Sequence, residues 1–182
     1  WTVRACAGAW HRDTAHRLLF ERQDKSTVPA LKELLPNLER LNAHSELSEL
    51  LSLEAMWVLE GMNELSDASL LGLVYAGLDA SQHRVREQAI RLADTRLPRA
   101  AKLVESLEAH KRERDTLPDD LSEFEHSPLH ALYTEVPLKI YDESLHVRFQ
   151  TALSLGAMPG TLATGLLAEL GFRDAANPWA RT

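Results

Sequence analysis

Cysteine and long apolar runs are nearly missing from this chain. Cys6 is the single cysteine among 182 residues, which excludes an internal disulfide framework and a zinc site built from several cysteines. No stretch reaches the roughly 18 apolar residues that a membrane-spanning helix needs, and no basic-then-apolar leader precedes Trp1. The chain also lacks an initiator methionine, and we expect it to be a piece of a longer protein.

Glycine and proline are also scarce, and acidic residues outnumber basic ones. Eight glycines and eight prolines are too few for a loop-rich β-sandwich, whereas the abundant Leu, Ala, Glu and Arg favour helices. The net charge of -7 argues against a general binder of nucleic acid or of anionic membranes, because clustered Lys and Arg hold such partners. With 45% hydrophobic and 26% charged residues, the chain is expected to fold. No stretch alternates at period two for long enough to predict a strand.

One phrase recurs along the chain and can be aligned without gaps around an anchor, which is arginine in all copies except one. The anchors are Arg12, Ser52, Arg86, Arg148 and Arg181. Small residues follow three positions later, at Ala15, Ala55, Ala89 and Thr151. Six and seven positions after the anchor come Leu18 and Leu19, Val58 and Leu59, Leu92 and Ala93, and Ser154 and Leu155. This pattern predicts one apolar stripe on each helix.

The spacing of the anchors predicts stacked helix pairs. Successive anchors are about 35 residues apart, except for a first interval of about 40 and a third of about 60. A second helix is expected in each unit after a cap or turn signal. Ser26 or Thr27 is the expected N-cap before Pro29, "SDASLLGLVYAGL" repeats the signal, and "MPGTLATGLLAELG" is expected to close on Gly171. The predicted fold is therefore an all-α, right-handed superhelix of about four helix pairs, in one domain over residues 1–182.

Aspartates precede three of the anchors: Asp79, Asp142 and Asp174 lie six or seven residues before their arginines. An Asp there can cap the first helix of a unit, and the arginine can reach a loop carboxylate of its own or of the neighbouring unit. We interpret these residues as structural ladders. The functional alternative is a row of arginines that binds anions.

The long third interval predicts an insertion at about residues 99–127. It comprises a helix through "RAAKLVESLEAHKRER" and an acidic, poorly apolar segment, "DTLPDDLSEFEHS". "PLHALYTEVPLKIYDE" is then expected to restore the second helix of the unit. Six basic residues lie in 84–102 and six acidic residues in 113–125: Arg84, Arg86, Arg91, Arg96, Arg99 and Lys102, and Glu113, Asp115, Asp119, Asp120, Glu123 and Glu125. These neighbours either neutralise one another or form a docking surface for a charged partner.

Four phrases together resemble a known family: "AWHRDTAHRLLFERQDKSTVPALKELL", "LEAMWVLEGM", "HRVREQAIRLAD" and "HVRFQTALSLG". They are similar to the HEAT-repeat region, of the PBS-lyase type, in multidomain bacterial haem-binding CxxCH proteins described as membrane-bound dehydrogenase-like. The resemblance covers residues 10–96 and about 128–182. It implies a parent protein with a β-propeller before this region and a c-type cytochrome module after it, in a periplasmic or other extracytoplasmic location. The insertion departs from the family pattern.

The chemistry of that family carries over to no residue of this chain. There is no CxxCH motif, and Ala7 follows Cys6. No catalytic, cofactor-binding or metal-binding residue is therefore assigned, and haem c is expected only elsewhere in the parent. The resemblance implies a spacer that holds flanking modules apart and contacts proteins or adjacent domains.

Two clusters of histidine and acidic residues are candidate metal sites. His11 and His16 are five residues apart and diverge around a helix, so they are not expected to chelate with Asp13. His126 and His130 are four apart and near acidic residues, but Ser127 and Pro128 predict a helix start that leaves His126 outside. Glu123 and Glu125 complete that second cluster.

The two repeat tryptophans, Trp10 and Trp57, are expected in the core rather than as platforms for a ligand. The predicted function is a non-catalytic scaffold or spacer that binds protein, with no nucleic-acid partner. The rivals are a HEAT-like enzyme of the alkylpurine DNA glycosylase type, which would use a basic groove that the basic stretch at 84–102 could supply, and a stand-alone regulatory adaptor.

Overall fold

The computed structural model describes residues 9–35, 46–75, 83–113, 116–156, 158 and 161–175. These residues form helices and no strands, so the predicted all-α class is confirmed. In chain order the elements are α1 (Ala9–Arg22), the 3-10 helix η2 (Lys25–Thr27), α2 (Val28–Lys32), α3 (Glu46–Gly61), α4 (Asp67–Tyr75), α5 (His83–Ala93), α6 (Leu97–Glu113), α7 (Asp119–Glu125), α8 (Pro128–Leu138), the 3-10 helix η4 (Lys139–Tyr141), α9 (Leu145–Gly156) and α10 (Thr161–Asp174).

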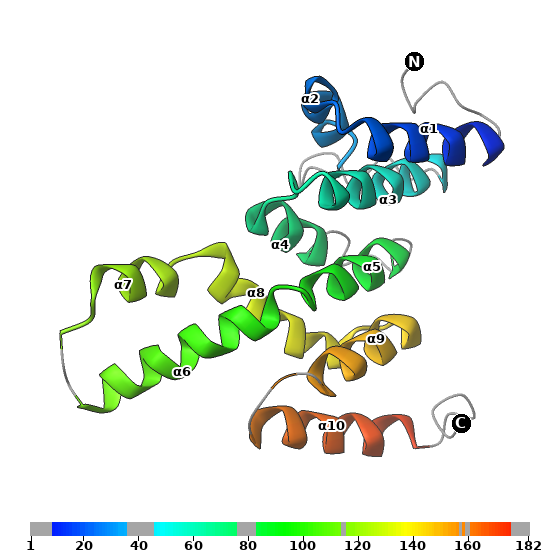
Figure 1. Ribbon diagram of the computed structural model, residues 1–182. Coiled ribbons are helices and arrows are strands. Elements are labelled where there is room, and N and C mark those ends of the chain that lie inside the picture. The colour runs from blue at the N-terminus through cyan, green and yellow to red at the C-terminus, as the bar shows by residue number, and fades with distance from the viewer. Residues whose placement is uncertain are drawn as a thin grey trace.

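The helices that carry the repeated phrase pack against one another in chain order. α1 contacts α3, α3 contacts α5, and α5 contacts α9 most extensively. Figure 1 shows these four helices following one another down one side of the molecule. We call them the first helices. The rings of His83 and His146 stack with centroids 5.8 Å apart, which joins the N-terminal ends of α5 and α9.

The remaining helices cover the other side of this row. α2 packs on α3, α4 packs on α5 and α8, and α10 packs on α9. Because α8 contacts both α4 and α5, the chain returns to the row after the long interval, as the sequence predicts. α6 and α7 project away from the row beside α8 (Figure 1).

The small residues three positions after the anchor are where the first helices meet the core. Ala55, Ala89 and Thr151 are all at most 1% exposed, and Ala15 of α1 is partly buried. Small side chains let neighbouring helices approach closely, and larger apolar side chains fill the remaining space. The main core accordingly contains Met56, Leu59, Leu70, Leu73, Ile90, Leu132, Ile140 and Leu155, all fully buried.

Most helix starts follow the predicted signals. The Ser127 hydroxyl accepts a hydrogen bond from the backbone N–H of His130, and Pro128 occupies the first turn of α8. Thr27 is the N-cap residue of α2, although its side chain makes no capping hydrogen bond to that helix. The predicted closure of the last helix at Gly171 is wrong, because α10 continues to Asp174. The last turn is held from outside: Arg148 pairs with Asp174, and Arg173 donates to the carbonyl of Ile140.

The predicted ladder of arginines and aspartates is present in the described units. Arg86 Nε and Nη2 donate to the two carboxylate oxygens of Asp142 at 2.9 and 3.0 Å. Arg148 binds Asp174 in the same two-pronged way, at 3.0 and 2.8 Å. Each arginine therefore reaches the aspartate at the end of its own unit: Asp142 directly follows η4, and Asp174 is the last residue of α10. Both pairs are buried, with side chains at most 11% exposed, and this favours a structural interpretation.

Other members of the ladder differ or lie outside the description. Ser52, the anchor without a charge, donates to the carbonyl of Leu34 instead. Asp79 and Arg181 lie outside the described residues, as does the side chain of Arg12. Asp142 also accepts from the backbone N–H of Ser144, so it holds the turn before α9 while it binds Arg86.

The acidic segment of the insertion forms a helix and contributes to a core, neither of which the sequence predicted. α6 confirms the predicted helix, but the acidic segment then forms α7, whose Leu121 and Phe124 are about 5% exposed or less. They pack with Ala100, Leu107 and Leu129 into a second, smaller core. Leu121 and Phe124 are three residues apart, so one turn of helix brings both side chains to the same face of α7. Two apolar residues are therefore enough for this short helix to join the second core.

Candidate docking groove

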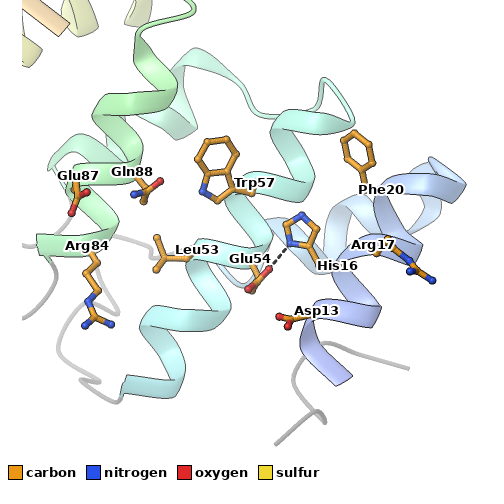
Figure 2. A pocket seen from close by; sticks show the side chains of 10 residues that line it. All are labelled: Asp13, His16, Arg17, Phe20, Leu53, Glu54, Trp57, Arg84, Glu87 and Gln88. Atoms are coloured by element: carbon orange, nitrogen blue, oxygen red, sulfur yellow. Dashed lines mark hydrogen bonds and ion pairs between the residues drawn. The ribbon is translucent and has the colours of Figure 1, made fainter. Parts of the chain in front are cut away.

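An open groove crosses three first helices, α1, α3 and α5. Its volume is about 820 Å³, and its described lining consists of Asp13, His16, Arg17, Phe20, Leu53, Glu54, Trp57, Arg84, Glu87 and Gln88. Figure 2 shows Leu53 and Trp57 of α3 between the α1 residues and the α5 residues. Residues from three repeat units, far apart in sequence, are thus brought together.

The floor of the groove is apolar. Leu53 and Trp57, one helical turn apart on α3, are partly buried against the main core. Phe20 of α1 is 48% exposed and lies against the backbone of Gly61. A Cβ at Gly61 would overlap the Phe20 ring, so the ring packs in this position because residue 61 has no side chain. Gln23 reinforces the contact by donating to the carbonyl of Gly61 at 3.3 Å.

Charged groups of both signs surround the apolar floor. His16 Nδ1 hydrogen-bonds to Glu54 Oε2, which links α1 to α3. Arg84 and Glu87 line the α5 side, and Asp13 lies near the start of the α1 side (Figure 2). Arg17 is paired with Glu21 of its own helix at 3.4 Å. The groove is therefore amphipathic and has no single sign of charge.

The register of the repeat explains this composition. Positions one and five after the anchor fall on one helix face, because residues four apart lie one turn apart. In α3 these positions hold Leu53 and Trp57, and in α5 the first of them holds Glu87. The same register explains why the prediction of a core position for Trp10 is wrong: Trp10 is 72% exposed. It lies two residues before its anchor, where Arg84 and His146 are also exposed.

Trp57 is an intermediate case. We expected it to be a core residue, and it does pack against the main core, but one side faces the groove. The sequence signal that could have identified the groove is the repeat register, which places Leu53 and Trp57 together on one face of α3, away from Ala55.

Neither candidate metal cluster brings three ligand side chains together in the described part of the chain. Among the described residues, no three His, Cys, Asp or Glu side chains lie together as ligands would. His11 is exposed and packs edge-on against Trp10, while His16 turns into the groove beside Asp13, so the two histidines diverge as predicted.

The second cluster is divided between structural roles. Lys111 Nζ binds Glu125 at 2.7 Å and lowers the pKa of that carboxyl through a hydrogen bond. His126 lies between α7 and α8, outside α8 as predicted, and the His130 ring packs edge-on against Phe124. Glu123 is exposed.

The basic stretch at 84–102 does not form a continuous surface. Arg86 is buried on Asp142, and Arg96 binds Glu60 and Asp67 at 2.7 and 2.8 Å. These partners lie outside the acidic stretch at 113–125, so the expected mutual neutralisation of the two stretches is wrong for both arginines. The pKa of Arg96 is raised, chiefly by its hydrogen bonds to Glu60. Arg91, Arg99 and Lys102 are exposed.

Comparison with protein-family models, curated proteins and solved structures found no match to this chain. In the described part of the chain, no helix has the length and apolar character needed to cross a bilayer.

Proposed function

We propose that this chain is a non-catalytic scaffold: a HEAT-like, right-handed superhelix of about four helix pairs whose first-helix groove docks protein. The order of contacts, α1 on α3, α3 on α5 and α5 on α9, supports a stack of repeats. The buried arginine ladder supports it too, since each described rung joins the first helix of a unit to the aspartate at the end of that unit. The proposal retains the resemblance to the HEAT region of haem-binding dehydrogenase-like proteins, in which such a domain is a spacer.

The amphipathic lining of the groove is the observation that carries this proposal. A partly buried aromatic and aliphatic floor, ringed by charges of both signs, has the composition of protein interfaces, in which a desolvated apolar centre is surrounded by a polar rim. Trp57 is suited to a central role, because Trp is among the residues that contribute most to binding energy. Its side chain is already positioned by the main core and needs little ordering on binding.

The nucleic-acid alternative receives less support. A duplex-binding groove needs several free Lys or Arg side chains to contact phosphates. Two of the six basic residues at 84–102 are committed to internal carboxylates, and the groove lining sets Asp13, Glu54 and Glu87 beside its two arginines.

Photo-crosslinking tests the proposal. Gln88, a partly buried lining residue, is replaced by photoreactive benzoylphenylalanine. The full-length protein carrying this replacement is produced and irradiated in the cells of its source organism. The matched control places the same residue at Lys102, which is exposed on α6 outside the groove. We expect a defined protein adduct, identified by mass spectrometry, at position 88 and not at 102. Adducts at neither position, or to nucleic acid at 88, would refute the proposal.

A further inference from the structure

The groove is a trough between two helices. α1 and α5 form its walls and α3 forms its floor, and Figure 1 shows the three helices side by side. Its apolar side chains lie at three successive turns of α3: Leu53, Trp57, and Phe20 of α1, which lies against Gly61. Residues four apart on a helix are separated by about 6 Å along its axis, so this apolar strip is about 12 Å long.

An α-helix suits this trough better than an extended peptide does. The described elements around the groove are helices whose backbone groups bond internally, so they offer no strand edge to pair with an extended backbone. A docked helix satisfies its own backbone. It also presents apolar side chains one turn apart, at intervals of about 5–6 Å, which matches the spacing of the strip.

Two of the charged groups in the groove are already engaged. Arg17 pairs with Glu21 of its own helix, and Figure 2 shows its side chain directed away from Trp57. Glu54 is bonded to His16 and so ties α3 to α1. These two side chains therefore contribute little to the choice of a partner.

Three charged groups remain for a partner, and two of them are acidic. Asp13 lies on the α1 wall, and Arg84 and Glu87 lie on the α5 wall (Figure 2). None of the three has an ion-pair partner among the described residues. The free charges of the groove are therefore negative on balance. The whole chain is negative as well, at -7, so its field attracts a positively charged partner.

We propose that the groove binds a basic amphipathic helix of a partner protein. The apolar stripe of that helix packs on the floor of the groove. Lysine or arginine on its two flanks faces Asp13 on one wall and Glu87 on the other, and an acidic residue faces Arg84. This inference rests on the proposed function, because it names the kind of protein segment that the groove docks.

The apolar and the charged contacts have different roles. Trp57 and the other floor residues supply most of the affinity, because a desolvated aromatic side chain at the centre of an interface contributes more than exposed ion pairs do. Asp13 and Glu87 select the sign of charge on the partner, since a like charge facing either of them is unfavourable. Binding is expected to weaken as salt is added, because salt screens exposed charges.

Fluorescence anisotropy with labelled synthetic helices tests the proposal. Two peptides of about 18 residues, long enough to form helix in water, share leucines at i, i+4, i+7 and i+11. One carries lysine on both flanks of this stripe, and the other carries glutamate. We expect the lysine peptide to bind the purified chain at least about tenfold more tightly than the glutamate peptide. A third peptide, the lysine peptide with two prolines on its polar face, cannot form the helix and is expected not to bind.

Charge reversal locates the bound peptide. Asp13→Lys, at an exposed position, and Glu87→Lys are each expected to weaken binding of the lysine peptide at least about fivefold. The double variant prefers the glutamate peptide, and Arg84→Glu tightens binding of the lysine peptide. The matched control is Glu123→Lys, the same change at an exposed position of α7 outside the groove, which leaves the affinity unchanged.

Four results would each overturn the proposal. The lysine peptide could fail to bind at concentrations up to about 1 mM. The lysine and glutamate peptides could bind equally well. The proline peptide could bind as tightly as the lysine peptide, which would indicate an extended occupant. Finally, Asp13→Lys and Glu87→Lys could weaken binding no more than Glu123→Lys does.

The crosslinking experiment separates this inference from the proposed function. An adduct at position 88 whose partner residues map to a basic amphipathic helix supports both. An adduct to an acidic or extended segment, or to a second copy of this chain, overturns the helix inference and leaves the scaffold proposal standing. Absence of any protein adduct at 88 refutes the scaffold proposal and this inference with it.

Discussion

Replacing Arg86 by methionine tests the ladder that ties α5 to the aspartate at the end of its unit. Arg86 and Asp142 have side chains that are 4% and 8% exposed, and two charged hydrogen bonds join them at 2.9 and 3.0 Å. Methionine retains much of the apolar stem but leaves the Asp142 carboxylate buried without its cation. Removing one partner of a buried ion pair costs about 3–5 kcal/mol, mostly because of the uncompensated charge.

Urea unfolding followed by circular dichroism at pH 7 measures this loss. A domain of this size has a free energy of unfolding of roughly 5–15 kcal/mol, so Arg86→Met removes a large part of it. Adding Asp142→Asn recovers part of the loss, since the amide is neutral and its oxygen still accepts the hydrogen bond from the backbone N–H of Ser144. The control is Arg17→Met: its pair with Glu21 is exposed, with side chains 71% and 56% accessible, and contributes about 0.5 kcal/mol or less.

Two results would refute the reasoning. A loss below about 1 kcal/mol for Arg86→Met would mean that the buried pair is not formed as described. Equal stability of the single variant and the double variant with Asp142→Asn would mean that an unpaired charge is not the cause of the loss.

Three further predictions concern the core, the groove and a buried carboxyl. Trp57→Ala lowers the free energy of unfolding by roughly 2 kcal/mol, because one side of the ring faces the groove. Deleting a fully buried aromatic side chain costs about 3–5 kcal/mol. A loss of about 4 kcal/mol or more in chemical denaturation would mean that Trp57 is fully buried. Phe124→Ala lowers hydrogen-exchange protection in α6 and α7 before it affects α5, because the second core is a separate cluster; uniform loss across the chain would contradict this. Burial raises the pKa of Asp94, one of whose carboxylate oxygens is buried without a partner, so the charged form destabilises the fold as pH rises through that pKa. Asp94→Asn is therefore expected to be more stable than wild type at pH 7, and this advantage shrinks as pH falls through the raised pKa toward the ordinary aspartate value of 3.8; an advantage that stays constant from pH 7 to below that ordinary value would exclude the charge as its cause.

Much of the local structure follows from the sequence. The repeat register predicted which small residues are buried, at Ala55, Ala89 and Thr151, because that contact depends on one helix face and on side-chain size. It also predicted that anchor arginines would bind the aspartates, since an arginine on the first turn and a carboxylate near a helix terminus are close in any stacked arrangement. The start of α8 at Ser127 and Pro128 is decided by backbone hydrogen bonding within four residues.

The tertiary structure decided what each helix face meets. Sequence patterns correctly placed Trp10 and Trp57 on helices. They did not correctly predict how exposed each side chain is, because exposure depends on the neighbouring unit. The acidic segment showed too few apolar residues to predict a core, yet Leu121 and Phe124 are buried because α6 and α8 lie beside them. The groove likewise exists only where α1, α3 and α5 come side by side. Periodicity in a sequence determines the direction of a side chain from its own helix axis, whereas burial and binding surfaces depend on distances between helices that the chain order alone does not specify.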